Sequence, residues 1–367
     1  MTLDEAFLIQ QSIAELEFPF TFQKALQFAL FRTYGIPSIS RLLIATTQFT
    51  DPATATKRYV DTEVLVAEFA GYHPKSDRAL EAIARMNFIH SAYQRAGKIS
   101  NDDMLYTLSL FALEPVRWIG RYEWRPLTDL EKCALGTFWK AMGDAMDIRY
   151  DESLKSAGEK GWTDGLHWLE EVEEWAEDYE RRAMVPDVDN HRTAEQTTEI
   201  LLWYVPSWAK GAGRKVVTVL MDDRLRTAMM YEKPAQVYFT LVAVIFGVRR
   251  FCLRNFFPPR PGFLRNKNTS PTIDPSGKYP FRLMDAAPWY IKPTLWNRYG
   301  PFALVTRMMG LPVPGDEGDR YFPSGYTTQD VGPKSMQGKG MEFAKESKER
   351  ILKARMGSCP FVRVKAE

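Results

Sequence analysis

The chain has 367 residues, of which 45% are hydrophobic and 26% are charged, as in folded globular proteins rather than disordered ones. Its net charge of +2 lacks the basic excess of a nucleic-acid-binding protein, so we expect no nucleic-acid partner. The three cysteines, Cys133, Cys252 and Cys359, are too widely spaced for a disulfide framework or a zinc site. This composition indicates an intracellular protein.

Capping residues and helical spacing of apolar side chains predict helices through the first two thirds of the chain. Ser100 and the acids after it open a helix that we expect Pro115 to end. Thr128 and Thr193 each stand three residues before a Glu or Gln, which is the spacing of a capping box. Only residues 215–220 suggest a strand, and a helix competes there. We predict an all-α fold, a single large helical bundle.

Residues 234–248 form the most apolar run of the chain, and two arginines follow it directly. The run is shorter than the roughly 18 residues that cross a bilayer. We favour a buried helix. The alternative is a helix that lies in a membrane interface, because arginines alternate with phenylalanines through residues 246–267.

Prolines mark a change of organisation after residue 256, since 14 of the 23 prolines lie from Pro258 onward. Such a density predicts loops. We therefore divide the chain into a helical core over residues 1–256, a loop-rich extension over 257–337 that packs on the core, and a charged tail over 338–367. We expect one helix within the extension, near residues 293–309.

One of the four histidines has an unusual setting. His73, His167 and His191 lie in polar surroundings and are interpreted as surface residues. His90 lies in a helix bracketed by a Ser cap and a C-terminal glycine, and its face is mainly apolar, with Ile83, Met86, Asn87 and Tyr93. The spacing alone leaves two interpretations open, a hydrogen-bonded core histidine or an axial haem ligand.

A second pattern lies upstream, where Arg58 and Thr62 are four residues apart and share one face of a predicted helix over residues 55–69. A cation and a hydroxyl on one face are common on solvated surfaces. The same pair also suits a polar corner of an apolar pocket, where both side chains would hydrogen-bond an oxygen ligand. The residues alone do not choose between the two.

These patterns occur in ordered segments that resemble the mpaB/rubber-oxygenase catalytic family, which includes latex-clearing proteins and fungal oxygenases of the endoplasmic reticulum (ER). The segments are KRYVDTEVL with Arg58 and Thr62, ARMNFIH with His90, RYEWRPLTDLE and FWKAMGDAM. The resemblance is greatest to the fungal branch. Its specificity comes from the order of the segments, because an Arg and a Thr four residues apart are a weak pattern alone.

The resemblance implies a haem b (iron) oxygenase that uses O₂ to cleave or oxidise a carbon–carbon double bond of an apolar prenyl or terpenoid substrate. It implies that His90 is the axial haem ligand and that Arg58 and Thr62 lie near the haem. It also implies a protein of the cytoplasm or of the ER membrane surface. Latex-clearing proteins carry a glutamate ahead of the Arg/Thr pair, but this sequence has none between Glu17 and Glu63. We therefore do not expect rubber as the substrate.

Two alternatives stay open, namely a haem peroxidase or monooxygenase of secondary metabolism, and a non-catalytic protein that binds haem or lipid at a membrane surface. Asp61 is a possible substitute for the missing glutamate, although one residue of offset turns its side chain about 100° from Thr62. Four arginines, interpreted as structural ion pairs, are the remaining candidates for haem propionate partners: Arg85, Arg117, Arg121 and Arg125.

Overall fold

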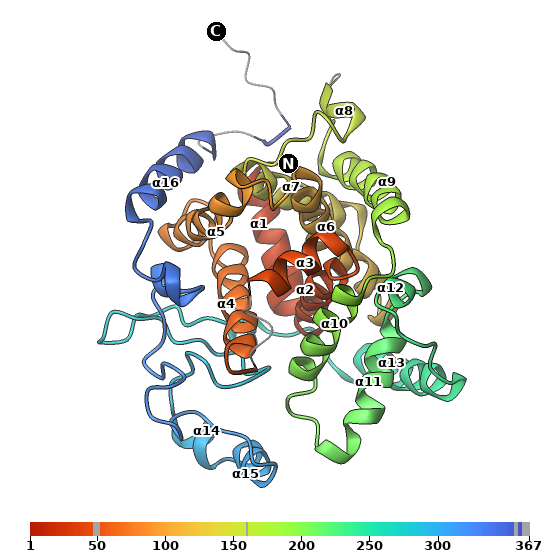
Figure 1. Ribbon diagram of the computed structural model, residues 1–367, viewed down its shortest axis with the longest axis vertical. Coiled ribbons are helices and arrows are strands. Elements are labelled where there is room, and N and C mark those ends of the chain that lie inside the picture. Colours follow the sequence, from red (N-terminus) through yellow and green to blue (C-terminus); the bar gives the residue numbers. More distant parts are fainter. Residues whose placement is uncertain (47–51, 159–160, 356–358, 362–367) are drawn as a thin grey trace.

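The computed structural model describes residues 1–46, 52–158, 161–355 and 359–361, which form an arrangement of helices joined by turns and loops (Figure 1). Within these ranges no segment is a β-strand, and extended backbone meets only in isolated bridges such as Thr269 with Phe281. The predicted all-α fold is confirmed.

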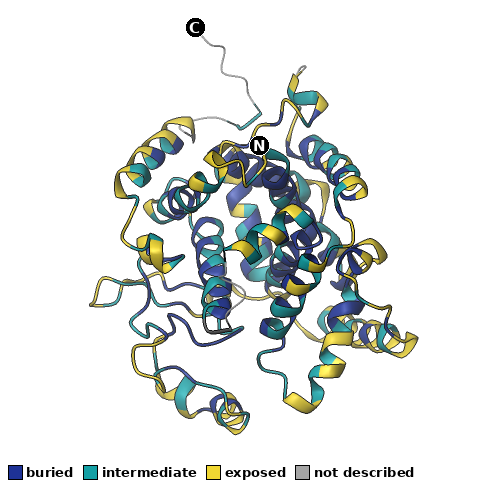
Figure 2. Cartoon of the chain, viewed as in Figure 1, coloured by how far each residue is buried: buried dark blue, intermediate teal, exposed yellow. Residues whose placement is uncertain are grey.

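Five helices enclose the main hydrophobic core. α2 packs against α6, and α7 packs against both α1 and α9. Large aromatic side chains fill the space between them, and Phe138, Trp139 and Trp168 are fully buried. Figure 2 shows this burial concentrated at the centre of the molecule. The five helices are α1 (Leu3–Ser12), α2 (Pro19–Thr33), α6 (Asn101–Tyr122), α7 (Asp129–Ala145) and α9 (Gly165–Ala183).

A second group of helices lies beside this core and carries the residues singled out in the sequence. α4 packs along α5, α3 packs on α10, and α16 covers α5 from outside (Figure 1). The bounds are α3 (Pro37–Ala45), α4 (Pro52–Gly71), α5 (Asp77–Arg95), α10 (Val188–Leu201) and α16 (Met341–Arg355).

The helix ends test the capping predictions. Thr128 forms the predicted capping box with Glu131 at the start of α7. The prediction that Pro115 ends a helix is wrong, because α6 continues to Tyr122 and is buried on both sides of the proline. Packing against α2 outweighs the one backbone hydrogen bond that proline removes. The capping box at Thr193 is also wrong, because α10 begins earlier, with Asp187 as its cap.

The apolar run forms α13 (Gln236–Phe256), and the favoured prediction of a buried helix is wrong. Among its residues, all of which the structure describes, only Val242 is buried. The helix has 21 residues and is apolar enough to cross a membrane by length and composition. Two contacts near its middle join it to α6: the rings of Phe246 and Tyr122 are 4.2 Å apart between centroids, and Arg249 lies 2.8 Å from Glu123.

Residues 257–337 are mostly loops and short helices. The single helix expected near residues 293–309 is two helices, α14 (Leu295–Tyr299) and α15 (Pro301–Met308), which meet at Gly300. The proposed boundaries at residues 256 and 337 stay predictions. The remaining elements are α8 (Lys155–Gly158), α11 (Lys210–Leu220), α12 (Asp223–Ala228), the π-helical turn η1 (Ile13–Glu17) and the 3₁₀ turns η2 (Ser207–Ala209), η3 (Gly262–Leu264), η4 (Thr328–Asp330) and η5 (Lys334–Met336).

Candidate functional site

A cavity of about 1020 Å³ lies between α3, α4, α5 and α6. This volume is at the upper end of the range of about 300–1,000 Å³ that is usual for small-molecule sites. Most of its wall is apolar, as suits a large hydrophobic ligand. The apolar lining includes Leu42, Leu65, Met86, Ile89, Phe111 and Trp139.

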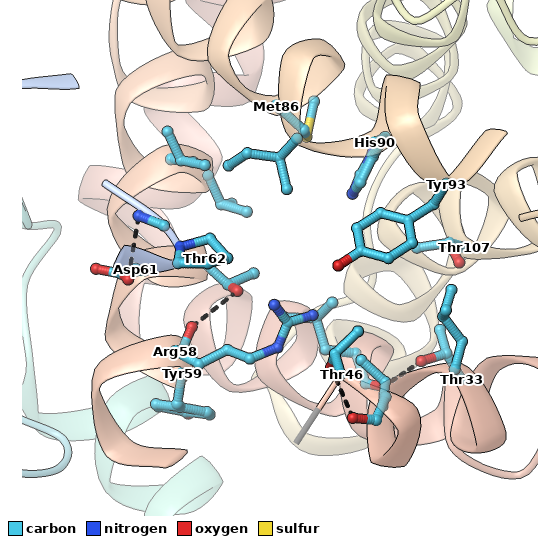
Figure 3. A pocket seen from close by; sticks show the side chains of 18 of the residues that line it. Thr33, Thr46, Arg58, Tyr59, Asp61, Thr62, Met86, His90, Tyr93 and Thr107 are labelled. Carbon is cyan, nitrogen blue, oxygen red and sulfur yellow. Dashed lines mark hydrogen bonds between the residues drawn. The ribbon is translucent and has the colours of Figure 1, made fainter. Parts of the chain in front are cut away.

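His90 forms part of the cavity wall on α5, and Figure 3 shows its ring turned toward the open space. Burial, and then the nearby Arg58 charge, lower the pKa of His90 to about 4. The imidazole is therefore neutral at pH 7, which is the form that ligates a metal. Its Nδ1 is buried and has no hydrogen-bond partner within the described part of the chain. The interpretation of His90 as a hydrogen-bonded core histidine thus loses its support.

Arg58 and Thr62 face the same cavity from α4, across the open space from His90 (Figure 3). The Thr62 hydroxyl donates to the backbone carbonyl of Arg58 at 3.0 Å. Burial lowers the pKa of the Arg58 guanidinium, whereas Tyr34, Tyr93 and Asp61 raise it. An arginine stays protonated at neutral pH, so a positive charge faces the cavity. The structure thus brings the three predicted site residues together in one cavity.

Asp61, the possible substitute for the missing glutamate, hydrogen-bonds to Lys57 and to two residues of the C-terminal loops. Its carboxylate accepts hydrogen bonds from Lys57 Nζ at 2.6 Å, from the Tyr290 hydroxyl at 2.7 Å and from the Gly332 backbone N–H at 3.1 Å. Tyr290 and Gly332 belong to the C-terminal loops. Asp61 also lines the cavity, but these three hydrogen bonds engage its carboxylate in fastening the loops to α4.

The other candidates lie outside the cavity. His191 Nδ1 is 2.8 Å from the Met229 carbonyl, and His73 Nε2 is 3.4 Å from an Asp4 oxygen. The four candidate arginines do not line the cavity either. Arg85 donates to the carbonyls of Val331, Met336 and Lys339, Arg117 pairs with Glu114 and Glu173, Arg125 pairs with Glu131, and Arg121 lies over the Tyr122 ring.

Sequence reasoning missed the parts of the wall that come from distant segments. Tyr34 and Thr33 reach the cavity from the end of α2, and Arg320 and Lys334 reach it from the C-terminal loops. No motif marks these residues, because only the folded chain brings their segments to α4 and α5.

The donor set suits a group that needs one protein ligand. No cluster of three or more His, Cys, Asp or Glu side chains that could hold a metal ion occurs in the described ranges. Haem takes four ligands from its own ring and often one histidine from a helix. A neutral imidazole at the wall of a large apolar cavity fits such a group.

Fold and cavity together define a helical protein with a large, mainly apolar cavity that has one histidine, His90, in its wall. No protein-family model matches the sequence. Known proteins do. The chain is 48% identical over 361 residues to the ER-bound oxygenase mpaB′ of Penicillium brevicompactum, which covers 98% of this chain and 85% of that protein.

Two further relatives carry a similar name. The ER-bound oxygenase mpaB of Penicillium brevicompactum is 44% identical over 337 residues, or 92% of this chain and 79% of that protein. The ER-bound oxygenase mpaB of Penicillium roqueforti (strain FM164) is 53% identical over 231 residues, or 63% of this chain and 77% of that protein. The chain belongs to the mpaB family of oxygenases, which confirms the resemblance found in the sequence.

Proposed function

We propose that this oxygenase is a haem b enzyme that uses O₂ to cleave or oxidise a carbon–carbon double bond in an apolar, prenylated or terpenoid substrate. The observation that carries the proposal is the neutral His90 imidazole at the wall of the large apolar cavity, opposite Arg58 and Thr62. The relatives, which are named ER-bound oxygenases, support the oxygenase chemistry.

Each residue has a distinct role in this proposal. His90 would hold the haem iron, and the bound haem supplies the redox chemistry with O₂. The Arg58 guanidinium stabilises negative charge that develops on oxygen atoms in the cavity, an effect that is large because burial excludes water. The Thr62 hydroxyl would add a hydrogen bond from the same helix face by turning its one proton away from the Arg58 carbonyl. The apolar wall holds the hydrocarbon chain of the substrate.

We also propose that the protein associates peripherally with the ER membrane, from which an apolar substrate would enter. Support comes from the exposed apolar side chains of α13 and the segments that follow, among them Phe251, Phe256, Phe263, Trp296 and Met308. No acidic residue occurs between Glu232 and Asp274 in the sequence, while Arg250, Arg254 and Arg260 are exposed. Basic and aromatic residues together favour an anionic lipid surface.

The attachment of α13 favours a helix that lies along the membrane surface. Its contacts through Phe246 and Arg249 hold the middle of the helix against α6. A helix fixed at its middle to a folded core does not have both ends free to reach opposite sides of a bilayer.

The test of the reaction is product analysis with isotope-labelled O₂ and a prenylated phenol as substrate. We expect two carbonyl products that each carry label, and Arg58→Ala should lower the rate about 10²–10³-fold, as loss of one charge-stabilising donor does elsewhere. Label in one product only would indicate a monooxygenase, and dependence on hydrogen peroxide would indicate a peroxidase. If no prenylated compound gives a product, the alternative of a non-catalytic binding protein would be favoured.

The membrane proposal has a separate test. Wild-type protein should float with vesicles that contain phosphatidylserine, and Phe251→Glu with Phe256→Glu should abolish flotation. Leu8→Glu is the matched control, because Leu8 is 62% exposed on α1, outside the proposed membrane-binding surface. Equal flotation of the three proteins would contradict the assignment of this surface.

A further inference from the structure

A second, smaller cavity lies on the other side of α4, with a volume of about 100 Å³. We call it the α4 chamber. Leu30, Tyr59, Val66 and Phe111 line both the chamber and the main cavity, so the two spaces share a wall. At about 30 Å³ for each water molecule, the α4 chamber has room for about three.

The wall of the α4 chamber contains polar atoms that the protein itself does not satisfy. Within the described residues, the amide nitrogen and oxygen of Gln10 are buried without a hydrogen-bond partner. The Tyr59 hydroxyl and Glu63 Oε2 are buried too, and they have no partner there apart from each other. A buried polar atom without a partner costs about 1–3 kcal/mol, and ordered water is the usual remedy. The α4 chamber lies beside these polar atoms and has the volume for ordered water.

Glu63 is the acidic group at the centre of this arrangement. Its Oε1 accepts from Gln27 Nε2 at 2.5 Å, and the same amide nitrogen lies 2.6 Å from Asp285. Asp285 in turn pairs with Lys24 at 2.9 Å. Burial, and then the charge of Asp285, raise the pKa of Glu63 to about 8. Glu63 thus carries a proton at neutral pH.

Helix geometry connects this acid with the main site. Tyr59 and Glu63 are four residues apart on one face of α4, and Arg58 and Thr62 are four apart on the adjoining face, about 100° away. A single helix therefore presents Arg58 and Thr62 to the main cavity, and Tyr59 and Glu63 to the α4 chamber. Tyr59 stands at the shared wall.

We propose that Glu63 is the proton-exchanging group of the main cavity, acting through water in the α4 chamber and the Tyr59 hydroxyl. This inference rests on the proposed oxygenase function. A proton leaves the Glu63 carboxyl to a chamber water, that water protonates the Tyr59 oxygen, and the Tyr59 proton passes to an oxygen atom of the reacting group. The reverse sequence returns a proton to Glu63, so the cycle consumes no proton and needs no further reactant.

Other titratable groups face the α4 chamber, and their contacts separate them from this role. Glu15 pairs with Arg265 at 2.9 Å, and burial raises its pKa while Arg265 and Lys267 lower it. Tyr72 accepts a hydrogen bond from Thr269 at 3.0 Å and donates to the Ser270 carbonyl at 3.1 Å. Among these acids in the part of the chain described, only Glu63 has a second oxygen that is buried with no partner other than the Tyr59 hydroxyl.

Infrared spectroscopy of the ligand-free protein tests the protonation state without any turnover. Wild type should show a protonated carboxyl C=O band at pH 7 that disappears with a midpoint near pH 8. Glu63→Gln should lack this band. Glu15→Gln, which removes the other carboxylate of the α4 chamber, should keep it. A wild-type spectrum without the band, or its loss in Glu15→Gln alone, would overturn the inference.

The pH profile of substrate oxidation is the closing experiment. Wild-type turnover should fall as the pH rises through about 8, because Glu63 then loses its proton. Glu63→Gln should be slower by about 10²–10⁴-fold, the usual effect of general acid–base catalysis, and its profile should lack that fall. Tyr59→Phe should keep the infrared band, and its rate of substrate oxidation should fall by a factor similar to that of Glu63→Gln. An active wild type with an equally active Glu63→Gln of the same profile would refute the role of Glu63, whereas an inactive wild type would refute the proposed function itself.

Discussion

The attachment of the C-terminal loops to α4 leads to a quantitative prediction for Asp61→Asn. The carboxylate is 5% exposed and holds Lys57, Tyr290 and the Gly332 backbone by hydrogen bonds. Asparagine keeps the volume but leaves the Lys57 ammonium, whose side chain is 12% exposed, without its counter-charge. Removing one partner of a buried ion pair costs about 3–5 kcal/mol. We expect a loss of that size in the free energy of unfolding.

Urea denaturation followed by tryptophan fluorescence measures this loss, and a double-mutant cycle identifies its source. Tyr290→Phe removes one hydrogen bond to a charged group and should cost about 1.5–3 kcal/mol. In the Asp61→Asn background it should cost much less, because the bond is already weakened. Asp178→Asn is the control, since its ion pairs with Arg181 and Arg182 are exposed, and such pairs contribute about 0–1 kcal/mol. A loss below about 1 kcal/mol for Asp61→Asn, or equal costs of Tyr290→Phe in both backgrounds, would refute the reasoning.

Two further predictions concern stability. The ligand-free protein should lose about 3 kcal/mol of stability as the pH falls from 6.5 to about 4, because the unfolded chain binds a proton that the buried His90 excludes, at about 1.36 kcal/mol for each pKa unit. His90→Gln should remove this part of the pH dependence, and urea midpoints that shift equally with pH in both proteins would contradict it. Gly136→Ala should cost about 1–3 kcal/mol or more, since the added Cβ would lie 2.0 Å from the Gly165 carbonyl oxygen between α7 and α9. Gly120→Ala, with open space around it, should be neutral or gain up to about 1 kcal/mol in the same urea assay, and equal effects of the two substitutions would count against this packing.

Local sequence patterns were sufficient to predict most of the helices and to predict which residues share a face of α4 and of α5. The Ser76 cap, the Thr128 capping box and helical spacing depend on neighbours a few residues away, and each appears in the structure. The errors arose where distant segments decide. Pro115 stays helical because α2 covers α6, and α13 is exposed although its apolar composition resembles that of a core helix.

The candidate site could be predicted only in part for the same reason. Residue spacing predicted that Arg58 and Thr62 share a helix face and that His90 lies on an apolar face. Only the fold brings the two helices to one cavity. The partners of Asp61 lie more than 200 residues away in the sequence, at Tyr290 and Gly332. The Glu63 network likewise joins α4 to Gln27 and Asp285, and no local pattern indicates it.

The central claim is that His90 holds a haem, and the absorption spectrum of the purified protein tests it most directly. After reconstitution with haem b, wild type should show a Soret band at one haem for each chain. His90→Ala should lose that band while keeping its helical circular dichroism, and added imidazole should restore the band by occupying the space left by the side chain. A Soret band of undiminished intensity and position in His90→Ala would contradict the assignment.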